Sequence, residues 1–600
     1  MPSKASVGGA LPRRTHRGLV PVLAALVVMA MVGACQRRRE HSGSAGDQLD
    51  GVWPAAGVRQ RGGAVGLAPP GWADDHTRGG PASGQPTRPA DRVAVRQPGG
   101  PGDSGVAMVT DRGDALDAQT GGRLDIVGWD PRGAGGSTPV SCFADPAERA
   151  SLWQDQPVPT TRRDERRYLA KTVELARRCG ARNGDLLAHI STTDTVRDLD
   201  HLRQLVGDRR LTFLGESTGT LIGLTYANLF PRRVRAMALD GVEDPVRWLA
   251  GTASALAQSF TDTDPAFGQF LRLCEAAGPD RCALAGHGPV APYVERVLRR
   301  LRHHPIPAPS ATPPCELTYG ELLTLLKFAV LPDPAIWPQA ATLLEAAAQG
   351  DASDMETIAR GYASEEFHRG LEPGIAILCA DSPARQDASA WPRVVHRLQG
   401  ISRVGAAPQG WAVGAPCASW PARAASRYTR PWNATTASPI LLVGTRFDPN
   451  TPLVNARLAE RRLGNAVLLT HDGYGHLSKA DPSGCIIEAT GRYLVDLSTP
   501  PPGTVCPPTA PPSTPSSASR PSLGRWAERN PASKGGTMDA TRKLYRSRTN
   551  RKVAGVCGGL AQYFNTDATV IRVLFVVLAV LGGSGLLIYL AMWIIVPSEP

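Results

Sequence analysis

Short apolar runs and segments with helical spacing of apolar residues alternate over the middle of the chain. The apolar runs that have the length of buried strands are at 124–129, 211–214, 234–239, 439–444 and 466–470. Helical spacing is found at 164–178, 193–206, 290–302, 319–330 and 338–348. Strands that alternate with helices in this way predict a fold of the α/β class.

Several of the helical segments fall together between residues 246 and 437. Strand-like runs lie on both sides of them, in a first core part at 95–245 and a second at 438–507. We therefore predict a helical cap that is inserted between core strands. Insertions of this kind cover an active site and select which substrates enter it.

The start of the chain has the pattern of an export signal. Three arginines within 13–17 precede an apolar stretch at 19–32, and small residues then lead to Cys35. This order predicts a secretory signal over 1–35. Cys35 after Gly-Ala also resembles the lipobox of bacterial lipoproteins, in which that cysteine receives lipid. Ordinary signal cleavage is the alternative.

The other end of the chain has a membrane-type pattern. A linker at 508–537 is rich in Pro, Ser and Thr. In the last segment, 538–600, residues 573–596 form an apolar stretch that is long enough to cross a bilayer. Basic residues at 543–552 precede this predicted span, so the positive-inside rule would keep them cytoplasmic, whereas the signal exports the core. Two proteins merged into one reading frame would resolve the conflict, and a genuine fusion is the alternative.

A serine motif follows the run at 211–214. Gly215-Glu-Ser217-Thr-Gly219 stands between that run and a helical segment, which is the arrangement of the nucleophile elbow of α/β-hydrolases. The turn is too tight for a side chain at either glycine. It exposes the Ser217 hydroxyl and places the Thr218 N–H at a helix N-terminus, where it can meet an oxyanion.

An acid and a histidine follow in the order that this fold requires. Asp448 comes four residues after the run at 439–444, and His476 lies in a loop after the next run. The histidine would take the serine proton, and the acid would orient the imidazole. Asp240 and His471 also stand at strand ends, but we favour Asp448 as the acid and His476 as the base.

A glycine-rich loop at 98–105 lies where an α/β-hydrolase supplies its second oxyanion N–H. Pro101 has no N–H to give, so Gly100 is the predicted donor beside Thr218. After the next strand, Asp130 and Arg132 flank a second glycine-rich turn. We expect these two side chains to form a structural ion pair.

Several ordered motifs carry a family resemblance. PGGPGDSG, DIVGWDPRGAGGSTPVSC, FLGESTGT, ILLVGTRFDPNTP and DGYGH resemble bacterial secreted tripeptidyl aminopeptidases with their TAP-like C-terminal segment, over about 95–507. The resemblance implies an α/β-hydrolase fold and a serine exopeptidase that removes short peptides, often tripeptides, from free N-termini. It implies a catalytic triad of Ser217, Asp448 and His476, with Gly100 and Thr218 as the oxyanion hole. The family commonly has an aromatic residue where Thr218 stands, so the pocket wall differs here.

The resemblance also bears on the segment at 36–94. This segment is rich in Gly, Pro, Ala, Arg and Asp, and it has no apolar run long enough for a strand. A disordered linker is the first interpretation. Because the family normally has its first strands here, we also consider a segment that is read out of frame or was replaced. The last segment, with KLYRSRTNRKVAGVCGGLAQYF, resembles the phage-shock protein C family of membrane proteins.

Most of the cysteines lie within the hydrolase region, without the clustered spacing of a metal site. With export they predict disulfides, and we expect neither a metal nor another cofactor. Proximity and the resemblance suggest the pairs Cys142–Cys179, Cys274–Cys282, Cys379–Cys417 and Cys485–Cys506, which leaves Cys315 unpaired.

Charge adds two expectations. The net charge of +12 is concentrated beside the hydrophobic segments at both ends, which indicates membrane proximity rather than nucleic acid as the partner. An exopeptidase also needs a carboxylate for the free ammonium of its substrate. Glu243, Asp244 and Asp381 are the candidates, since they stand at strand-end or cap positions.

Three functions are consistent with these patterns. The leading hypothesis is an exported serine aminopeptidase of the cell envelope, attached by a lipid, by the C-terminal helix, or by both. A serine esterase or amidase on the same fold is the first alternative. The second is an envelope-stress membrane protein whose hydrolase region is inactive because it lacks the first strands.

Overall fold

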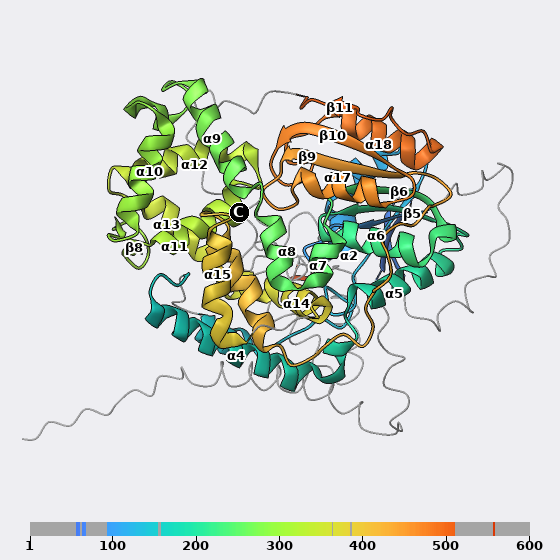
Figure 1. The fold of residues 1–600 in the computed structure, drawn as a ribbon, viewed down its shortest axis with the longest axis horizontal. Helices are drawn as coiled ribbons and strands as arrows, with labels where there is room; N and C mark the ends of the chain where they lie inside the picture. The colour runs from blue at the N-terminus through green and yellow to red at the C-terminus, as the bar shows by residue number, and fades with distance from the viewer. Residues whose placement is uncertain are drawn as a thin grey trace, which may run out of the picture.

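A nine-stranded sheet organises the part of the chain that the computed structural model describes, which is residues 56–60, 63–67, 93–153, 158–362, 364–383, 387–509 and 556–557 (Figure 1). The strand order is β11-β10-β9-β6-β5-β3-β4-β1-β2. The pairings from β4 to β11 are parallel, and β1 pairs antiparallel with both β4 and β2. The strands are β1 (Ala56–Gln60), β2 (Gly63–Leu67), β3 (Val93–Gln97), β4 (Asp125–Trp129), β5 (Leu211–Glu216), β6 (Val234–Asp240), β9 (Ile440–Phe447), β10 (Ala466–Tyr474) and β11 (Val505–Cys506).

Helices cover both faces of this sheet. On one face lie α2 (Gly105–Gln119) and α18 (Gly484–Asp496), and on the other lie α5 (Thr192–Leu205), α6 (Thr218–Leu229) and α17 (Leu453–Arg462). Successive strand residues serve the two faces in turn, since Ala94 packs with α2 and Val95 packs with α5. Burial on both faces explains why these strands are nearly continuous apolar runs in the sequence.

The structure contradicts the expectation that 36–94 contains no strand. β1 and β2 form a hairpin, and β1 pairs with β4 in a register that sets Ala56 opposite Trp129. The free edge of β4 presents a row of backbone N–H and C=O groups, and another strand can satisfy them whatever its side chains are. A search for apolar runs misses a strand that is held by backbone pairing at a sheet edge.

The predicted cap is present as two helical lobes, which occupy the left and lower parts of Figure 1. One lobe contains α9 (Thr263–Ala277), α10 (Val290–Leu301), α11 (Tyr319–Leu325), a π-helical turn (Leu326–Val330), α12 (Trp337–Ala348), α13 (Ser353–Tyr362) and the hairpin β7 (Ile306–Ala308) with β8 (Cys315–Leu317). The other contains α7 (Pro245–Ala250), α8 (Thr252–Ser259), α14 (Glu365–Asp381), α15 (Trp391–Gln399) and α16 (Ala406–Gln409).

The second lobe also packs against helices from the first core part. These are α3 (Pro146–Trp153) and the long helix α4 (Arg162–Asn183), which runs along the lower edge of the molecule in Figure 1. The chain enters the cap after β6 and returns to the sheet in β9, and these two strands are neighbours. The insertion therefore leaves and rejoins the sheet at one place.

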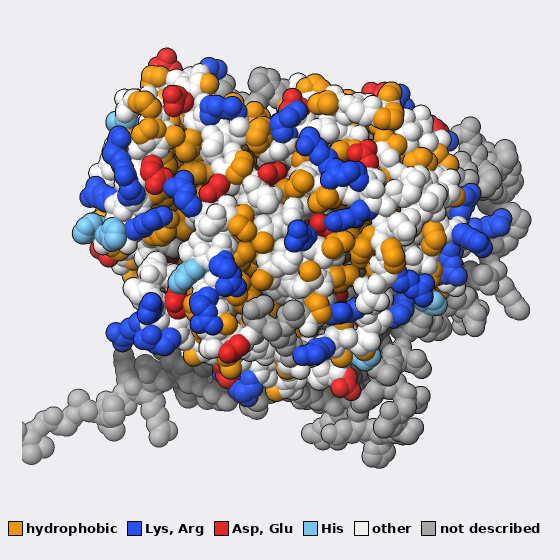
Figure 2. Space-filling model, viewed as in Figure 1, with side chains coloured by type: hydrophobic (Ala, Val, Ile, Leu, Met, Phe, Trp, Pro, Cys, Tyr) orange, Lys and Arg blue, Asp and Glu red, His pale blue; other side chains and the backbone are white. Residues whose placement is uncertain are grey.

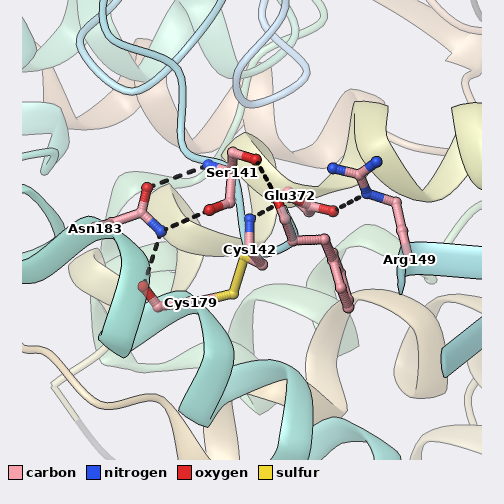
Figure 3. The surroundings of a disulfide bond; sticks show 7 residues. Ser141, Cys142, Arg149, Cys179, Asn183 and Glu372 are labelled. Atoms are coloured by element: carbon pink, nitrogen blue, oxygen red, sulfur yellow. Dashed lines mark hydrogen bonds and ion pairs between the residues drawn. A yellow bond between two sulfur atoms is a disulfide. The ribbon is translucent and has the colours of Figure 1, made fainter. Parts of the chain in front are cut away.

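Four disulfides are formed, and they are the four pairs that the sequence suggested: Cys142–Cys179, Cys274–Cys282, Cys379–Cys417 and Cys485–Cys506. Figure 3 shows how the first of them joins three elements. The Cys142 N–H donates to Glu372 of α14 at 2.7 Å, and Glu372 forms an ion pair with Arg149 of α3 at 2.5 Å. The side chain of Asn183 in α4 accepts a hydrogen bond from the Ser141 N–H and donates to the carbonyl groups of Ser141 and Cys179. Cys315 is a free cysteine.

One structural ion pair differs from the expectation. Arg132 pairs with Asp198 of α5, at 2.5 Å, and not with Asp130. Asp130 instead accepts hydrogen bonds from the Ser104 hydroxyl and the Gly136 N–H. The long arginine side chain reaches α5, whereas the short aspartate bonds its own turn and the N-terminus of α2.

The predicted membrane segments fall almost wholly outside the residues that the structure describes. Within the ranges that the structure describes, no helix combines the length and the apolar character that a bilayer crossing needs. The predicted span at 573–596, the signal at 1–35 with Cys35, and nearly all of the linker lie outside those ranges. On the face drawn in Figure 2, Lys and Arg side chains are distributed among acidic and apolar ones over cap and core.

Candidate active site

Ser217 stands in a strained turn between β5 and α6. Its φ is +53° and its ψ is −127°, a conformation that costs on the order of 1–3 kcal/mol for a residue with a side chain. A Cβ on Gly215 would come within 2.5 Å of the Gly219 carbonyl oxygen, and one on Gly219 within 2.5 Å of the Gln97 carbonyl oxygen. The Gly-x-Ser-x-Gly spacing is therefore a direct requirement of this turn.

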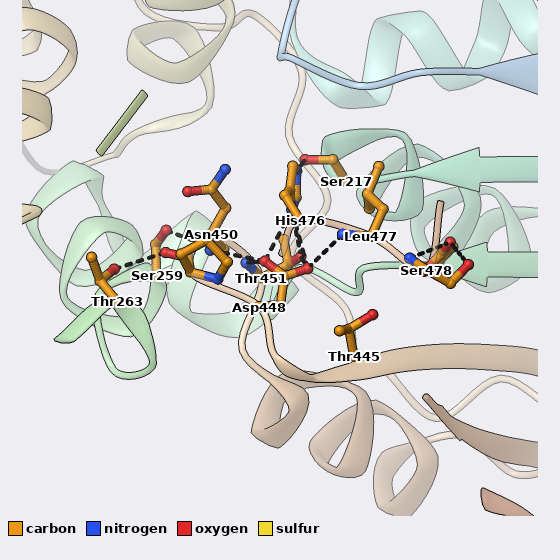
Figure 4. A network of polar contacts seen from close by, with 12 residues as sticks. Ser217, Ser259, Thr263, Thr445, Asp448, Asn450, Thr451, His476, Leu477 and Ser478 are labelled. Atoms are coloured by element: carbon orange, nitrogen blue, oxygen red, sulfur yellow. Dashed lines mark hydrogen bonds and ion pairs between the residues drawn. The ribbon is translucent and has the colours of Figure 1, made fainter. Parts of the chain in front are cut away.

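His476 connects the serine to the acid. Its Nε2 lies 3.1 Å from Ser217 Oγ, and its Nδ1 lies 3.0 Å and 3.1 Å from the two carboxylate oxygens of Asp448 (Figure 4). The three side chains follow the carboxyl ends of β5, β10 and β9. Because these strands are parallel, their carboxyl ends lie on the same side of the sheet, and the side chains meet there. The structure thus brings together the three residues that the sequence predicted, in the geometry of a nucleophile, base and acid.

Asp448 is fully buried and well supplied with donors. One oxygen accepts from the N–H groups of Asn450 (2.8 Å) and Thr451 (2.9 Å), and the other from the Leu477 N–H (3.0 Å) and the Thr451 hydroxyl (2.8 Å). Burial by itself raises the pKa of this carboxyl, but the charge of His476 and these hydrogen bonds lower the pKa below its ordinary value. Asp448 is therefore held as a carboxylate, the form that can orient His476.

The two rival residues make their polar contacts elsewhere. Asp240 accepts hydrogen bonds from the backbone N–H and hydroxyl of Ser478, and burial, with the nearby charge of Glu216, raises its pKa to about 7. His471 is fully buried, with Nδ1 3.2 Å from the Thr445 hydroxyl, and burial lowers its pKa to about 4. Asp240 braces the loop behind His476, and His471 belongs to the core.

The glycine-rich loop lies directly against the elbow. A Cβ on Gly99 would come within 2.8 Å of the Thr218 nitrogen and 2.5 Å of the Glu216 carbonyl oxygen. Gly99, Pro101 and Thr218 line a cavity of about 20 Å³, which has room for a group of the size of one water. The Thr218 N–H is in the first turn of α6, where it has no acceptor within the helix. The donor roles of Gly100 and Thr218 remain predictions.

Two of the three candidate ammonium ligands are already bound by the protein. Asp381 accepts from the Thr192 N–H (2.9 Å), the Thr192 hydroxyl (2.6 Å) and the Trp248 indole N–H (2.9 Å). Asp244 forms an ion pair with Arg462 at 2.5 Å and accepts from the first turn of α7. Both carboxylates are buried in these contacts, so we favour Glu243 over Asp244 and Asp381 as the ammonium ligand.

Glu243 is different because it is half-buried and close to the acid of the triad. Burial, together with the charges of Asp448 and Asp244, raises the pKa of Glu243 to about 8, although Lys327 acts in the opposite direction. A carboxyl of this kind gains its charge most readily when a cation comes close to it. Glu243 is therefore the candidate that we retain.

Two further side chains near the triad make contacts that the sequence analysis did not predict. Glu216, next to the nucleophile, forms ion pairs with Lys479 and with Arg112 (3.6 Å), on the face of the sheet covered by α2. Lys327 reaches from the cap to the loop of Asp448, as described below. Glu216 stands at a variable position of the elbow motif, and Lys327 belongs to no motif, so only the fold reveals what these side chains contact. In the described ranges, no group of three or more His, Cys, Asp or Glu could hold a metal ion.

Family models match the chain in three places. The model described as alpha/beta hydrolase fold matches residues 95–274, the TAP-like protein model matches 404–506, and the PspC domain model matches 542–599. A solved esterase from Thermogutta terrifontis aligns over 68% of this chain and 90% of its own, with a TM-score of 0.26 and 12% identity, a likeness too distant to bear on function.

Relatives of known name cover the same region. Serine protease Hip1 of Mycobacterium tuberculosis is 30% identical over 433 residues, which are 69% of this chain and 80% of the relative. Tripeptidyl aminopeptidase of Streptomyces lividans is 31% identical over 438 residues, 70% of this chain and 77% of its own. Carboxylesterase B of Mycobacterium tuberculosis is 32% identical over 427 residues, which are 68% of this chain and 79% of the relative. The hydrolase region is followed in the chain by a PspC domain. The chain is therefore a serine hydrolase that belongs to the α/β-hydrolase family of tripeptidyl aminopeptidase and serine protease Hip1.

Proposed function

We propose that this protein is an exported serine exopeptidase that releases short peptides, most readily tripeptides, from free N-termini. The observation that carries the proposal is the contact series Ser217–His476–Asp448, with a half-buried Glu243 near the acid. The named relatives that cleave peptides support the reaction class.

The proposed reaction follows the acyl-enzyme route. Ser217 Oγ attacks the scissile carbonyl while His476 Nε2 accepts the hydroxyl proton and Asp448 stabilises the resulting imidazolium. The oxyanion that forms accepts hydrogen bonds from the N–H groups of Gly100 and Thr218. His476 then gives the proton to the leaving amine, the C–N bond breaks, and water, deprotonated by the same histidine, releases the peptide and restores Ser217.

Glu243 would provide the selectivity for free N-termini. In the proposed complex the substrate's ammonium group approaches Glu243 and ionises it, so the pair forms only with a substrate whose N-terminus is free. The distance between that carboxylate and Ser217 would then set how many residues are removed. The cap, which we place at 246–437 between the core parts at 95–245 and 438–507, would exclude longer chains.

The location is proposed from the two ends of the sequence. The signal at 1–35 would export the hydrolase, lipid on Cys35 would attach it to the envelope, and residues 573–596 would cross the membrane if 538–600 is part of the same protein. The match to the PspC domain supports this membrane association. Peptides with free N-termini are the expected partners, and nucleic acid is not.

The test compares three chromogenic substrates: a tripeptide anilide with a free N-terminus, the same peptide with an acetylated N-terminus, and a short-chain ester. We expect the free tripeptide to be cleaved at least tenfold faster than the acetylated one, and Ser217→Ala to abolish both reactions. Glu243→Gln should remove most of the preference for the free N-terminus, with little effect on ester hydrolysis. Equal cleavage of free and acetylated peptide would reject the exopeptidase proposal.

A serine esterase is the second candidate, because a relative of 32% identity has the name carboxylesterase B. Rapid turnover of the ester with no cleavage of either peptide would favour it. An inactive hydrolase is the third candidate. A fluorophosphonate probe that labels the wild type but not Ser217→Ala would exclude it.

A further inference from the structure

A short cap segment, residues 326–334, touches both of the loops that carry the acid and the base. It begins with the π-helical turn Leu326–Val330, in which the Leu331 N–H donates to the Leu326 carbonyl at 3.0 Å, and it ends at Pro334. π-Turns within helices are rare and are frequently found at functional sites. We define this stretch as the strap segment.

The first contact of the strap segment is with the acid loop. Lys327 is 1% exposed, and its Nζ donates to the Pro449 carbonyl (2.8 Å) and the Asn450 side-chain oxygen (2.8 Å). Both acceptors directly follow Asp448. Two other cap residues bind the same loop, since the hydroxyls of Ser259 and Thr263 donate to its carbonyl groups at 2.6 Å and 2.7 Å (Figure 4).

The second contact is with the base loop. The backbone N–H of His476 donates to the Pro332 carbonyl at 2.9 Å. Gly475 fits so closely that a Cβ there would come within 2.5 Å of the Pro334 ring and 2.8 Å of the Pro332 carbonyl oxygen. Trp337 fixes the segment from behind, since its indole N–H donates to the Val330 carbonyl at 2.8 Å and its ring meets Tyr474 edge-on.

We propose that the strap segment holds the loops of Asp448 and His476 in register with each other, and that Lys327 is a positioning residue of the triad. This inference rests on the proposed roles of Ser217, His476 and Asp448. The cap then has a part in the chemistry in addition to covering the site. A displacement of one loop by about 1 Å would lengthen the Asp448–His476 hydrogen bond, and errors of that size cost on the order of 100-fold in rate.

The charge of Lys327 gives the proposal an electrostatic signature. Burial lowers the pKa of Lys327 to about 7, against the opposing effect of three acids that face it: Asp448 after β9, Glu243 after β6, and Asp264 on α9. Below pH 7 the ammonium is charged, and its positive potential at the acid loop opposes the gain of a further proton by the Asp448–His476 pair. Removing the ammonium should therefore move the acid limb of the pH–rate profile to higher pH.

The experiment compares Lys327→Met with Lys327→Arg in the whole protein, and uses Arg300→Met, which removes an exposed cap cation on α10, as the matched control. The substrates are the short ester and the free tripeptide anilide, and the comparison uses whichever of them the wild type turns over, so the result does not depend on peptide specificity. We expect Lys327→Met to lose about 10–100-fold in kcat with KM changed less than threefold. The acid limb should shift upward, Lys327→Arg should restore part of kcat, and Arg300→Met should match the wild type.

Asn450→Ala provides a second measurement from the other side of the contact. If Lys327 acts through this loop, the double variant Lys327→Met/Asn450→Ala should lose less than the product of the two single losses. An unchanged kcat and acid limb in Lys327→Met would overturn the inference, as would strictly multiplicative losses. Should Lys327→Met fail to fold, Asn450→Ala alone must lower kcat, or the inference is wrong. A wild type that turns over neither ester nor peptide would instead reject the proposed function.

Discussion

Substitution of Asp448 by asparagine should nearly abolish turnover without unfolding the protein. Each carboxylate oxygen accepts hydrogen bonds from two donors besides His476 Nδ1. Whichever way the asparagine amide turns, its NH₂ group faces two of these donors, so at least two hydrogen bonds are lost. The imidazole then has no carboxylate to fix its tautomer or to stabilise its charged form.

The expected loss is large, because the same change in a well-studied triad lowers kcat about 10⁴-fold, which corresponds to about 5.4 kcal/mol of transition-state stabilisation. The assay is the steady-state hydrolysis of the ester and the free tripeptide anilide, with circular dichroism to verify folding. Asp240→Asn is the matched control and should stay within tenfold of the wild type, since Asp240 binds Ser478. A loss below tenfold for Asp448→Asn, or an equal loss for Asp240→Asn, would refute the assignment of the acid.

Three further changes probe the scaffold of the site. Gly99→Ala should lower kcat/KM at least 100-fold, as measured with the ester, because its φ is +100° and its Cβ would lie 2.5 Å from the Glu216 carbonyl. The pKa of Asp240 is about 7 in the folded protein and 3.8 in the unfolded chain, so the folded state binds more protons between these two pH values. The free energy of unfolding should therefore fall by about 4 kcal/mol as pH rises from about 4 to 7. In urea titrations, Asp240→Asn should lack this fall. Replacing Cys142 and Cys179 by alanine removes a disulfide between residues that are 37 positions apart. This change should lower the free energy of unfolding by about 4 kcal/mol in the same titrations.

The sequence was most informative where function depends on local geometry. The elbow, the strand runs and the chain order of Ser217, Asp448 and His476 are readable because a tight turn and a buried parallel strand each restrict residue types over a few positions. The preference for Asp448 over Asp240 agrees with the contacts of His476. The glycines at 215 and 219 are required by backbone carbonyls that lie 2.5 Å from where a side chain would begin.

The rest depends on contacts between residues far apart in the chain, which no local pattern encodes. Asp381 and Asp244 resembled free acids, but Thr192, Trp248 and Arg462 bind them from other elements. The edge hairpin of β1 and β2 is held by backbone pairing, so its residue types carry little information. In the sequence, Lys327 belongs to an ordinary helical pattern at 319–330, and only the folded cap brings its ammonium group to Asn450.

The insertion of the cap between two neighbouring strands has a consequence for engineering and for evolution. The two points where the cap joins the core lie next to each other on the sheet, after β6 and before β9. A relative's cap could therefore be joined there without displacing a strand. In covalent terms the cap is an exchangeable module. Its contacts are less exchangeable, because a donor cap must also present an ammonium to Asn450 and a carbonyl to the His476 N–H. Chimeras that ignore these two atoms should fold, bind new substrates and yet turn them over slowly, so a change of specificity by cap exchange would need both contacts to be rebuilt.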